Sequence, residues 1–322
     1  MRVAVTGANG FIGRDLCQRL ARDGHEITAV VRREADALAR FGKVVRIDLT
    51  AERDAWASVL RGIQAVVHLA GRAHQGDAPD AETRADFWQV NVGNTRTLLE
   101  CAAASGVEHL LFMSSVKVFG ERSALDSDGR LERFTNSAVP RPQGPYGESK
   151  LDAERVLEAG CRRHGMQLTI LRPPLVYGPG VTGNLYSLLK AIQRGIPLPF
   201  ASIDNRRSLV HRANLNDAIV RALCSRGGRS RIYTLADLET STPALIRLMA
   251  AGLSCRTRLW HFPVAGLNLL GHSIGRAAAI SRLTESLVVD SQAITNDLGW
   301  RPAVDPIAAW AEIGHQFKAE RA

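Results

Sequence analysis

The amino-acid sequence predicts an α/β fold built on a doubly wound parallel sheet. Short apolar segments alternate with longer amphipathic segments through the first half of the chain, and a glycine-rich turn directly follows the first apolar segment. Strands that alternate with helices of this length form a parallel sheet whose two faces are both covered by helices. Right-handed crossovers then fix the direction in which the sheet is wound.

The boundaries of the expected elements follow from this alternation. The expected strands are Arg2–Thr6, Glu26–Val31, Val44–Ile47, Ala65–Leu69, Leu110–Met113 and Gln167–Leu171. The expected helices are Gly10–Asp23, Asp86–Ser105 and Tyr146–His164. Past Arg172, glycine and proline punctuate shorter and less regular segments. We therefore predict a first domain over residues 1–172 and a smaller α/β domain over residues 173–322.

Composition and charge exclude several classes of protein. The chain has 322 residues, of which 45% are apolar, and a formal net charge of +9. Because its arginines are scattered, we expect no nucleic-acid partner; a cleft for phosphorylated small molecules would account for part of the charge. The five cysteines form no close pair, which indicates a reducing compartment. No metal site is expected.

The sequence also gives no sign of a membrane-spanning segment. No stretch approaches the roughly 18 consecutive apolar residues that a span needs, and the chain runs straight into its first strand without a leader. The apolar segment Val264–Leu270 is short, so we expect a packed helix there. These features predict a cytoplasmic protein without membrane insertion.

The glycine-rich turn points to a dinucleotide. Gly7, Gly10 and Gly13 stand between the first expected strand and the first expected helix. The first glycine permits a tight turn, the second lets backbone approach a pyrophosphate, and the third lets helix and strand pack closely. The helix N-terminus offers free N–H groups to the phosphates. The turn therefore predicts a Rossmann-type cofactor-binding domain.

The end of the second expected strand bears on which cofactor is bound. An acidic residue there would bond the ribose hydroxyls of NAD. This chain instead places Arg32 and Arg33 directly after the strand. Guanidinium groups can hold a 2′-phosphate with charge assistance, so we favour NADP(H). NAD(H) stays possible if both arginines are solvated loop residues.

A tyrosine, a lysine and a serine form the candidate catalytic group. Tyr146 and Lys150 are four residues apart and share one face of the expected helix. A neighbouring ammonium favours the phenolate and lowers a tyrosine pKa, which suits acid–base work. Ser115 lies just past the strand Leu110–Met113, where ligands of parallel sheets bind.

Taken together, the T-G-x-x-G-x-x-G turn, the serine and the Tyr-x-x-x-Lys motif resemble the extended short-chain dehydrogenase/reductase superfamily, and in it the NAD-dependent epimerase/dehydratase family. The resemblance implies that Tyr146 is the acid/base, that Lys150 lowers its pKa and bonds the nicotinamide ribose, and that Ser115 orients the reacting oxygen. A regulator that only senses the cofactor would typically lack the tyrosine and lysine. The resemblance spans nearly the whole chain.

The resemblance also implies further cofactor-binding residues. Asp48 matches a family position near the adenine, although a turn or helix-cap role explains it almost equally well. Asn91 matches a residue that supports the active site. The implied cofactor-binding residues include the three glycines, the two arginines, Tyr146 and Lys150. The others are Asn9, Phe11, Ile12, Asp48, Leu49, Leu69, Ala70, Gly71, Asn91 and Pro173.

The segment S-S-V-K-V-F-G that contains Ser115 bears on the reaction. Related 4,6-dehydratases carry an Asp-Glu pair where this chain has Val116 and Lys117, so elimination lacks its acid and base. The segment resembles that of reductases of UDP-4-keto-6-deoxy-N-acetylhexosamines, which serve bacterial surface polysaccharides such as the O-antigen of lipopolysaccharide. We therefore expect a 4-keto reductase. A UDP-hexose 4-epimerase, acting on UDP-glucose or UDP-N-acetylglucosamine, is the alternative.

The second half carries the implied substrate contacts. By the same resemblance, Lys117, Asn184 and Arg207 bind a nucleotide sugar, with Arg207 on its diphosphate; a surface charge is the less favoured alternative for Arg207. Asp217 is expected to be structural, and the tail Leu298–Pro302 to pack. A homodimer through Asp86–Ser105 and Tyr146–His164 is expected by resemblance.

Overall fold

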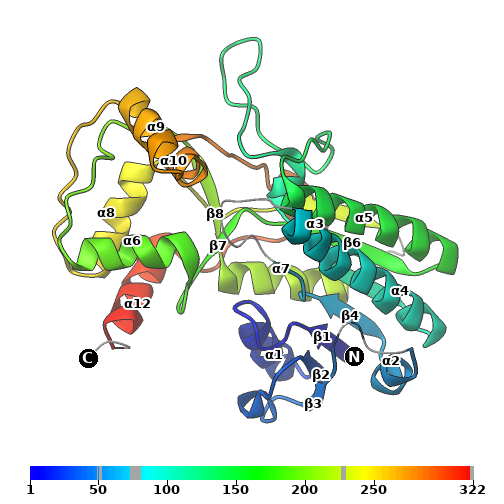
Figure 1. The fold of residues 1–322 in the computed structure, drawn as a ribbon. Helices are drawn as coiled ribbons and strands as arrows, with labels where there is room; N and C mark the ends of the chain where they lie inside the picture. The colour runs from blue at the N-terminus through cyan, green and yellow to red at the C-terminus, as the bar shows by residue number, and fades with distance from the viewer. Residues whose placement is uncertain (49, 51–52, 73–80, 226–229, 320–322) are drawn as a thin grey trace.

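A computed structural model describes residues 1–48, 50, 53–72, 81–225 and 230–319 of the chain. Its large sheet is parallel throughout and has the strand order β3-β2-β1-β4-β5-β6-β9. Figure 1 shows helices on both sides of this sheet, so the predicted doubly wound Rossmann-type fold is confirmed. The strands are β1 (Arg2–Thr6), β2 (Glu26–Val31), β3 (Lys43–Arg46), β4 (Ala65–His68), β5 (His109–Met113), β6 (Gln167–Arg172) and β9 (Arg231–Thr234).

Alternating side chains of the strands divide the core into two layers, because successive residues of a strand point to opposite faces. Val3 and Val5 face a core made with α1 (Gly13–Arg22), α7 (Arg212–Cys224) and α11 (Gln292–Leu298). Ala4 faces the other core, made with α2 (Arg53–Leu60), α4 (Asn94–Ala104) and α5 (Pro145–His164). The continuous apolar strands predicted from the sequence are therefore buried on both sides.

One expected helix is interrupted. The segment predicted as Asp86–Ser105 consists of α3 (Ala81–Trp88), a π-helical turn over Gln89–Gly93, and α4. Single π-turns inside α-helices frequently occur at functional sites. Here the turn contains Asn91, whose side chain is buried.

The large sheet also draws on chain beyond the predicted boundary at residue 172. Strand β9 pairs with β6 at the edge of the sheet, and α7 packs beside α1. The half of the molecule that contains the sheet is thus built from two separate stretches of chain. Its division from the second half at residue 172 stays a prediction.

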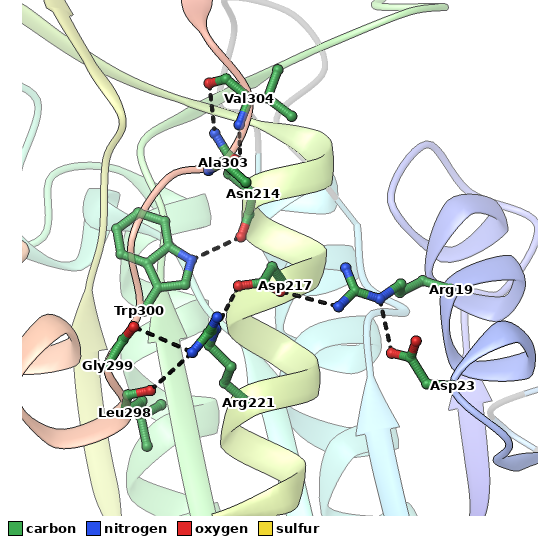
Figure 2. Close-up of polar contacts among 10 residues, drawn as sticks. All are labelled: Arg19, Asp23, Asn214, Asp217, Arg221, Leu298, Gly299, Trp300, Ala303 and Val304. Carbon is green, nitrogen blue, oxygen red and sulfur yellow. Dashed lines mark hydrogen bonds and ion pairs between the residues drawn. The ribbon is translucent and has the colours of Figure 1, made fainter.

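Helix α7 is tied to its surroundings on two sides, as Figure 2 shows. On one side, Asp217 accepts hydrogen bonds from Arg19 of α1 and from Arg221. On the other, the backbone oxygen of Asn214 accepts a 3.0 Å hydrogen bond from the indole of Trp300, which is 1% exposed. The predicted structural role of Asp217 is confirmed. In the tail Leu298–Pro302 only Trp300 is buried, and Arg301 and Pro302 are exposed, so the predicted packing holds for only part of the tail.

The second half has a smaller sheet of order β10-β8-β7, with bounds Leu238–Thr240, Arg207–His211 and Leu175–Tyr177. Helices α6 (Gly183–Gln193), α8 (Thr242–Gly252) and α12 (Pro306–Ala319) enclose a separate core with it. In that core the rings of Tyr177 and Trp310 stack at 5.1 Å.

Helices α9 (Val264–Ser273) and α10 (Ala277–Thr284) form a hairpin at the outer edge of this half (Figure 1). Among the described residues, no helix has the length and apolar character needed to cross a membrane. The segment Val264–Leu270 is helical as predicted, but the expected packing is incomplete. Leu269 and Leu270 are 72% and 53% exposed.

Replacing Asn214 by alanine should destabilise the fold. The amide oxygen of Asn214 accepts 3.0 Å hydrogen bonds from the N–H groups of Ala303 and Val304, and its amide nitrogen donates to Asp237 at 2.7 Å. Leaving these groups without a partner should lower the free energy of unfolding by roughly 2–4 kcal/mol in urea titration. The control Asn268→Ala, at an exposed position of α9, should change it by under about 0.5 kcal/mol. Equal effects would contradict this account.

Candidate active site

The glycine-rich turn lies at the carboxyl end of β1, against the segment that follows β4. Gly7 has φ +68°, and a Cβ atom there would lie 2.9 Å from the nitrogen of Ala70. A Cβ at Gly13 would lie 2.4 Å from the oxygen of Gly7, so helix α1 approaches the turn as closely as the sequence predicts. Side chains at Gly7 and Gly13 would therefore break the turn, which fits a backbone cradle for a dinucleotide.

Two residues of the turn make contacts that the sequence did not indicate. The oxygen of Asn9 accepts a 2.9 Å hydrogen bond from Arg14. The guanidinium of Arg212 lies 4.6 Å from the centre of the Phe11 ring and donates to the Phe11 oxygen at 3.3 Å. It also donates to the Pro179 oxygen at 2.7 Å. Arg212 thus connects the cofactor turn to the second half of the molecule.

A cavity of about 200 Å³ opens beside this turn. It brings together seven of the predicted site residues, which come from the start of α1, from α5 and from the segments after β4, β5 and β6. They are Ile12, Leu69, Gly71, Ser115, Tyr146, Lys150 and Pro173. The residues that line it without having been predicted are Arg72, Met113, Ser114, Pro174 and Val176.

The three candidate catalytic side chains meet in this cavity. The hydroxyl of Ser115 lies close enough to the phenol of Tyr146 to act on its pKa, and both side chains line the cavity. Lys150, one helical turn beyond Tyr146, donates a 2.7 Å hydrogen bond to the oxygen of Met113 at the end of β5. Its ammonium also lies 4.3 Å from the centre of the Phe112 ring. The predicted juxtaposition of phenol, hydroxyl and ammonium is therefore present.

The electrostatics of the group differ from the expectation. Burial raises the pKa of Tyr146, and the neighbouring Ser115 hydroxyl opposes this only in part. Burial also lowers the pKa of Lys150 to about 8, against the charge of Glu154. The expected lowering of the Tyr146 pKa by Lys150 is therefore wrong for the chain alone, because the ammonium is held by the Met113 oxygen and burial dominates. At neutral pH the phenol keeps its proton.

Asn91 holds two parts of the site in place. Its amide oxygen accepts a 2.8 Å hydrogen bond from the nitrogen of Arg72. Its amide nitrogen donates at 3.0 Å to the hydroxyl of Ser149. That hydroxyl in turn donates to the backbone carbonyl oxygen of Tyr146 at 2.9 Å. Asn91 thereby couples the segment after β4 to the first turn of α5. Direct contact between Asn91 and a cofactor stays a prediction.

A buried histidine extends this network to β1, and the sequence did not single it out. The hydroxyl of Thr95 donates its proton to the backbone oxygen of Asn91 at 2.7 Å. The same hydroxyl therefore accepts a 2.9 Å hydrogen bond from Nε2 of His68. Thr6 accepts from the nitrogen of Ala70 at 3.2 Å and donates to Nδ1 of His68 at 2.7 Å. Burial and the charge of Lys150 lower the pKa of His68 to about 3. His68 is therefore a neutral Nε2–H tautomer.

The end of β2 is open to solvent. Arg32 and Arg33 are both exposed there. Hydrogen bonds from Thr50 and the charge of Arg32 lower the pKa of Asp48, which places Asp48 near this end of the sheet. Glu34 lies three residues past β2 and forms an exposed 3.8 Å ion pair with Arg46. The predicted residue Leu49 lies outside the described residues.

A cluster of cations lies between the segment after β5 and the start of β8. Lys117 forms an ion pair with the carboxylate of Glu121, and Arg207 donates a 3.1 Å hydrogen bond to the backbone oxygen of Glu285. Burial lowers the pKa of both Lys117 and Arg207, and the charge of Arg282 lowers both further. Arg282, which the sequence analysis missed, therefore belongs to this cluster. Asn184 stands apart as an exposed residue in the first turn of α6.

The binding of a nicotinamide dinucleotide should weaken above about pH 8. The pKa of Lys150 is lowered from 10.5 to about 8, so its ammonium form prevails below that pH and is lost above it. The ammonium donates hydrogen bonds that the neutral amine forms less well. Titration of dinucleotide binding by fluorescence at several pH values should show this loss for the native protein. Lys150→Met should bind more weakly and without the inflection; a flat native profile would contradict the assignment.

Comparisons with known proteins agree with this geometry. The model of the "NAD dependent epimerase/dehydratase family" matches residues 3–236. The chain is 34% identical over 307 residues to a UDP-glucose 4-epimerase of Vibrio cholerae, covering 93% of this chain and 90% of that protein. It is 26% identical over 272 residues to the N-acetyl-α-D-glucosaminyl-diphospho-ditrans,octacis-undecaprenol 4-epimerase of Escherichia coli O157:H7, covering 84% and 77%.

A solved structure supports the fold. The crystal structure of UDP-glucuronic acid 4-epimerase from Bacillus cereus in complex with NAD superposes with a TM-score of 0.78 and covers both chains completely, at 19% identity. At that identity the likeness is one of fold alone. Since the family model spans the glycine-rich turn, Ser115, Tyr146 and Lys150, the chain belongs to the NAD-dependent epimerase/dehydratase family.

Proposed function

We propose that this chain is an NAD(P)-dependent oxidoreductase of UDP-sugars that reduces a 4-keto group. Its best substrate would be a UDP-4-keto-6-deoxy-N-acetylhexosamine used in surface polysaccharide synthesis. The observation that carries the proposal is the protonated phenol of Tyr146, close to Ser115 inside the cavity. Reduction of a ketone needs a proton donor at the carbonyl oxygen, and a protonated phenol in the cavity can serve as one.

The residues present fit a nicotinamide dinucleotide. The cradle of glycines would take the pyrophosphate, while Ile12 and Pro173 line the cavity next to the catalytic group. Lys150 uses one N–H for Met113, which leaves two for ribose hydroxyls. Exposed Arg32 and Arg33 suit a 2′-phosphate, so NADP(H) is favoured and NAD(H) is possible. When bound, the cofactor would supply the hydride.

In the reduction, Ser115 and Tyr146 act on the same oxygen. Both hydroxyls would donate to the substrate carbonyl and polarise it. As the carbonyl carbon gains a hydride, the phenol of Tyr146 gives its proton to the oxygen, and an alcohol forms. The remaining phenolate is stabilised by Ser115 and regains a proton from solvent. The network from His68 through Asn91 to Ser149 keeps the first turn of α5 in position.

The cation cluster would anchor the substrate by its diphosphate. Lys117, Arg207 and Arg282 interact electrostatically with one another, and guanidinium groups bind phosphates bidentately. Asn184 completes the proposed substrate contacts. At the position after Ser115, Val116 is buried and uncharged, and Lys117 is cationic, so a dehydration lacks its acid–base pair there.

A 4-epimerase of UDP-hexoses is the second candidate, because the Vibrio cholerae relative is a UDP-glucose 4-epimerase. The same side chains would serve, but Tyr146 would have to accept a proton before donating one. That order needs a phenolate at the start of the cycle. Burial alone raises the pKa of Tyr146, but the positive charge of an oxidised nicotinamide beside the phenol would favour the phenolate.

Two further proposals concern the protein as a whole. We propose a homodimer in which α4 and α5 pack against the same helices of a second copy. We also propose that the protein works in the cytoplasm. The five cysteines are free, and three of them, Cys17, Cys101 and Cys161, are buried.

The direct test supplies NADPH, or NADH, together with UDP-4-keto-6-deoxy-N-acetylglucosamine. We expect oxidation of one NADPH for each sugar reduced, followed by nicotinamide absorbance and by mass spectrometry of the product. NADPH should be used in preference to NADH. Failure to consume cofactor, combined with interconversion of UDP-glucose and UDP-galactose, would replace the reductase by the epimerase.

Variants separate chemistry from binding in the same assay. Tyr146→Phe should lower kcat by about 10²–10⁴-fold with little change in dinucleotide binding, because only the proton donor is lost. Tyr233→Phe is the matched control, since Tyr233 lies on β9 and bonds Asp297 at 3.0 Å, away from the cavity residues. It should keep near-native activity.

A further inference from the structure

The hairpin of α9 and α10 has an exposed apolar surface. The two helices pack mainly on each other, and no side chain of α10, which is described in full, is completely buried. Leu269, Leu270 and Ile274 are 72%, 53% and 60% exposed. In Figure 1 the hairpin lies at the edge of the molecule, away from the large sheet. Exposed apolar side chains gathered in one place mark an interaction surface more often than scattered ones do.

An aromatic pair extends this surface. Trp260 is 46% exposed and meets Phe262 edge to face at 5.4 Å. A Cβ at Gly266 would lie 2.8 Å from the Phe262 ring, so that ring packs on the first turn of α9. Trp260 is therefore held beside the helix. We call Trp260, Leu269, Leu270 and Ile274 the apolar patch.

The stretch of chain that carries the apolar patch is rich in positive charge. Residues 240–284 contain five arginines and two histidines but no aspartate or glutamate. Arg256, Arg258 and Arg276 are exposed there, as are His261 and His272. Asp204 is an exposed acid close to Trp260 and His261, since Ala201 bonds Trp260 and Ser202 bonds His261. The excess of arginines still complements an anionic surface.

We propose that the apolar patch and its arginines dock this protein on the surface of an anionic lipid bilayer. Tryptophan and leucine side chains insert shallowly at the boundary between headgroups and acyl chains, while arginines remain among the anionic headgroups. Helix α9 has 10 residues and lies on the membrane without crossing it. A symmetric contact with a second copy would instead bring two cationic rims together, which like-charge repulsion opposes.

The hairpin that carries the apolar patch also carries Arg282, which belongs to the cation cluster of the candidate active site. Arg282 is in α10, and its charge reaches Lys117 and Arg207. The same hairpin therefore carries the apolar patch and one member of the cation cluster. Docking would hold this end of the molecule at the membrane surface. The inference rests on the surface and its charge, and it does not depend on the reaction proposed above.

The test measures co-sedimentation of the full-length protein with vesicles. One set is phosphatidylcholine alone, and in the other roughly a third of the lipid is phosphatidylglycerol. We expect binding to the anionic vesicles, weakened by added salt, and little binding to the neutral ones. The variant Leu269→Ser/Leu270→Ser/Ile274→Ser should bind at least about tenfold more weakly. Native protein that does not prefer anionic vesicles overturns the proposal.

A matched control tests whether the effect belongs to the patch. Val139→Ser/Ile307→Ser removes two side chains that are each 69% exposed and lie outside the hairpin. It should bind vesicles as the native protein does; an equal loss overturns the proposal. Circular dichroism checks that both variants fold. Light scattering then compares the molecular mass of the native protein and of the patch variant in solution. A smaller assembly for the patch variant would show that a second copy covers the patch, and the proposal would then be wrong.

Discussion

The active-site geometry depends on one buried cation. Lys150 is 6% exposed, and its ammonium is fixed by the oxygen of Met113 where β5 ends. A buried ammonium is unfavourable unless hydrogen bonds compensate it, so its position is narrowly defined. That contact sets α5 against the carboxyl edge of the sheet. Tyr146, one turn earlier, is thereby brought to Ser115.

The histidine beside Lys150 stays neutral. A charged histidine beside it would be repelled, and the low pKa of His68 reflects both burial and that repulsion. Each hydroxyl from Thr6 to Ser149 has a defined donor or acceptor role. A network with all its hydrogen bonds satisfied is rigid, and through Ser149 it holds the first turn of α5, which carries Tyr146. Burial thus outweighs the lysine charge in setting the pKa of Tyr146 in the free protein.

The sequence predicts the sheet and the catalytic group because both leave local patterns. The strands are continuous apolar runs between glycines, and β1 and β2 have the predicted bounds. The glycine spacing and the four-residue separation of Tyr146 and Lys150 can be recognised without a structure.

Other parts of the site depend on contacts between distant segments. The bonds of His68 join β1, β4 and α4, and Arg282 reaches the cation cluster through a long connection in the second half. The return of β9 to the large sheet likewise has no local signal. The pKa of Tyr146 could not be predicted from the motif, because the motif shows the lysine but not the burial.

The most direct test of this account is the ionisation of Tyr146 in the free protein. The chain has four tyrosines, so carbon NMR of protein labelled at tyrosine Cζ can resolve Tyr146, with Tyr146→Phe identifying its signal. The account predicts a Tyr146 pKa above the ordinary value of 10.0. A phenolate that forms near neutral pH without any cofactor would contradict it.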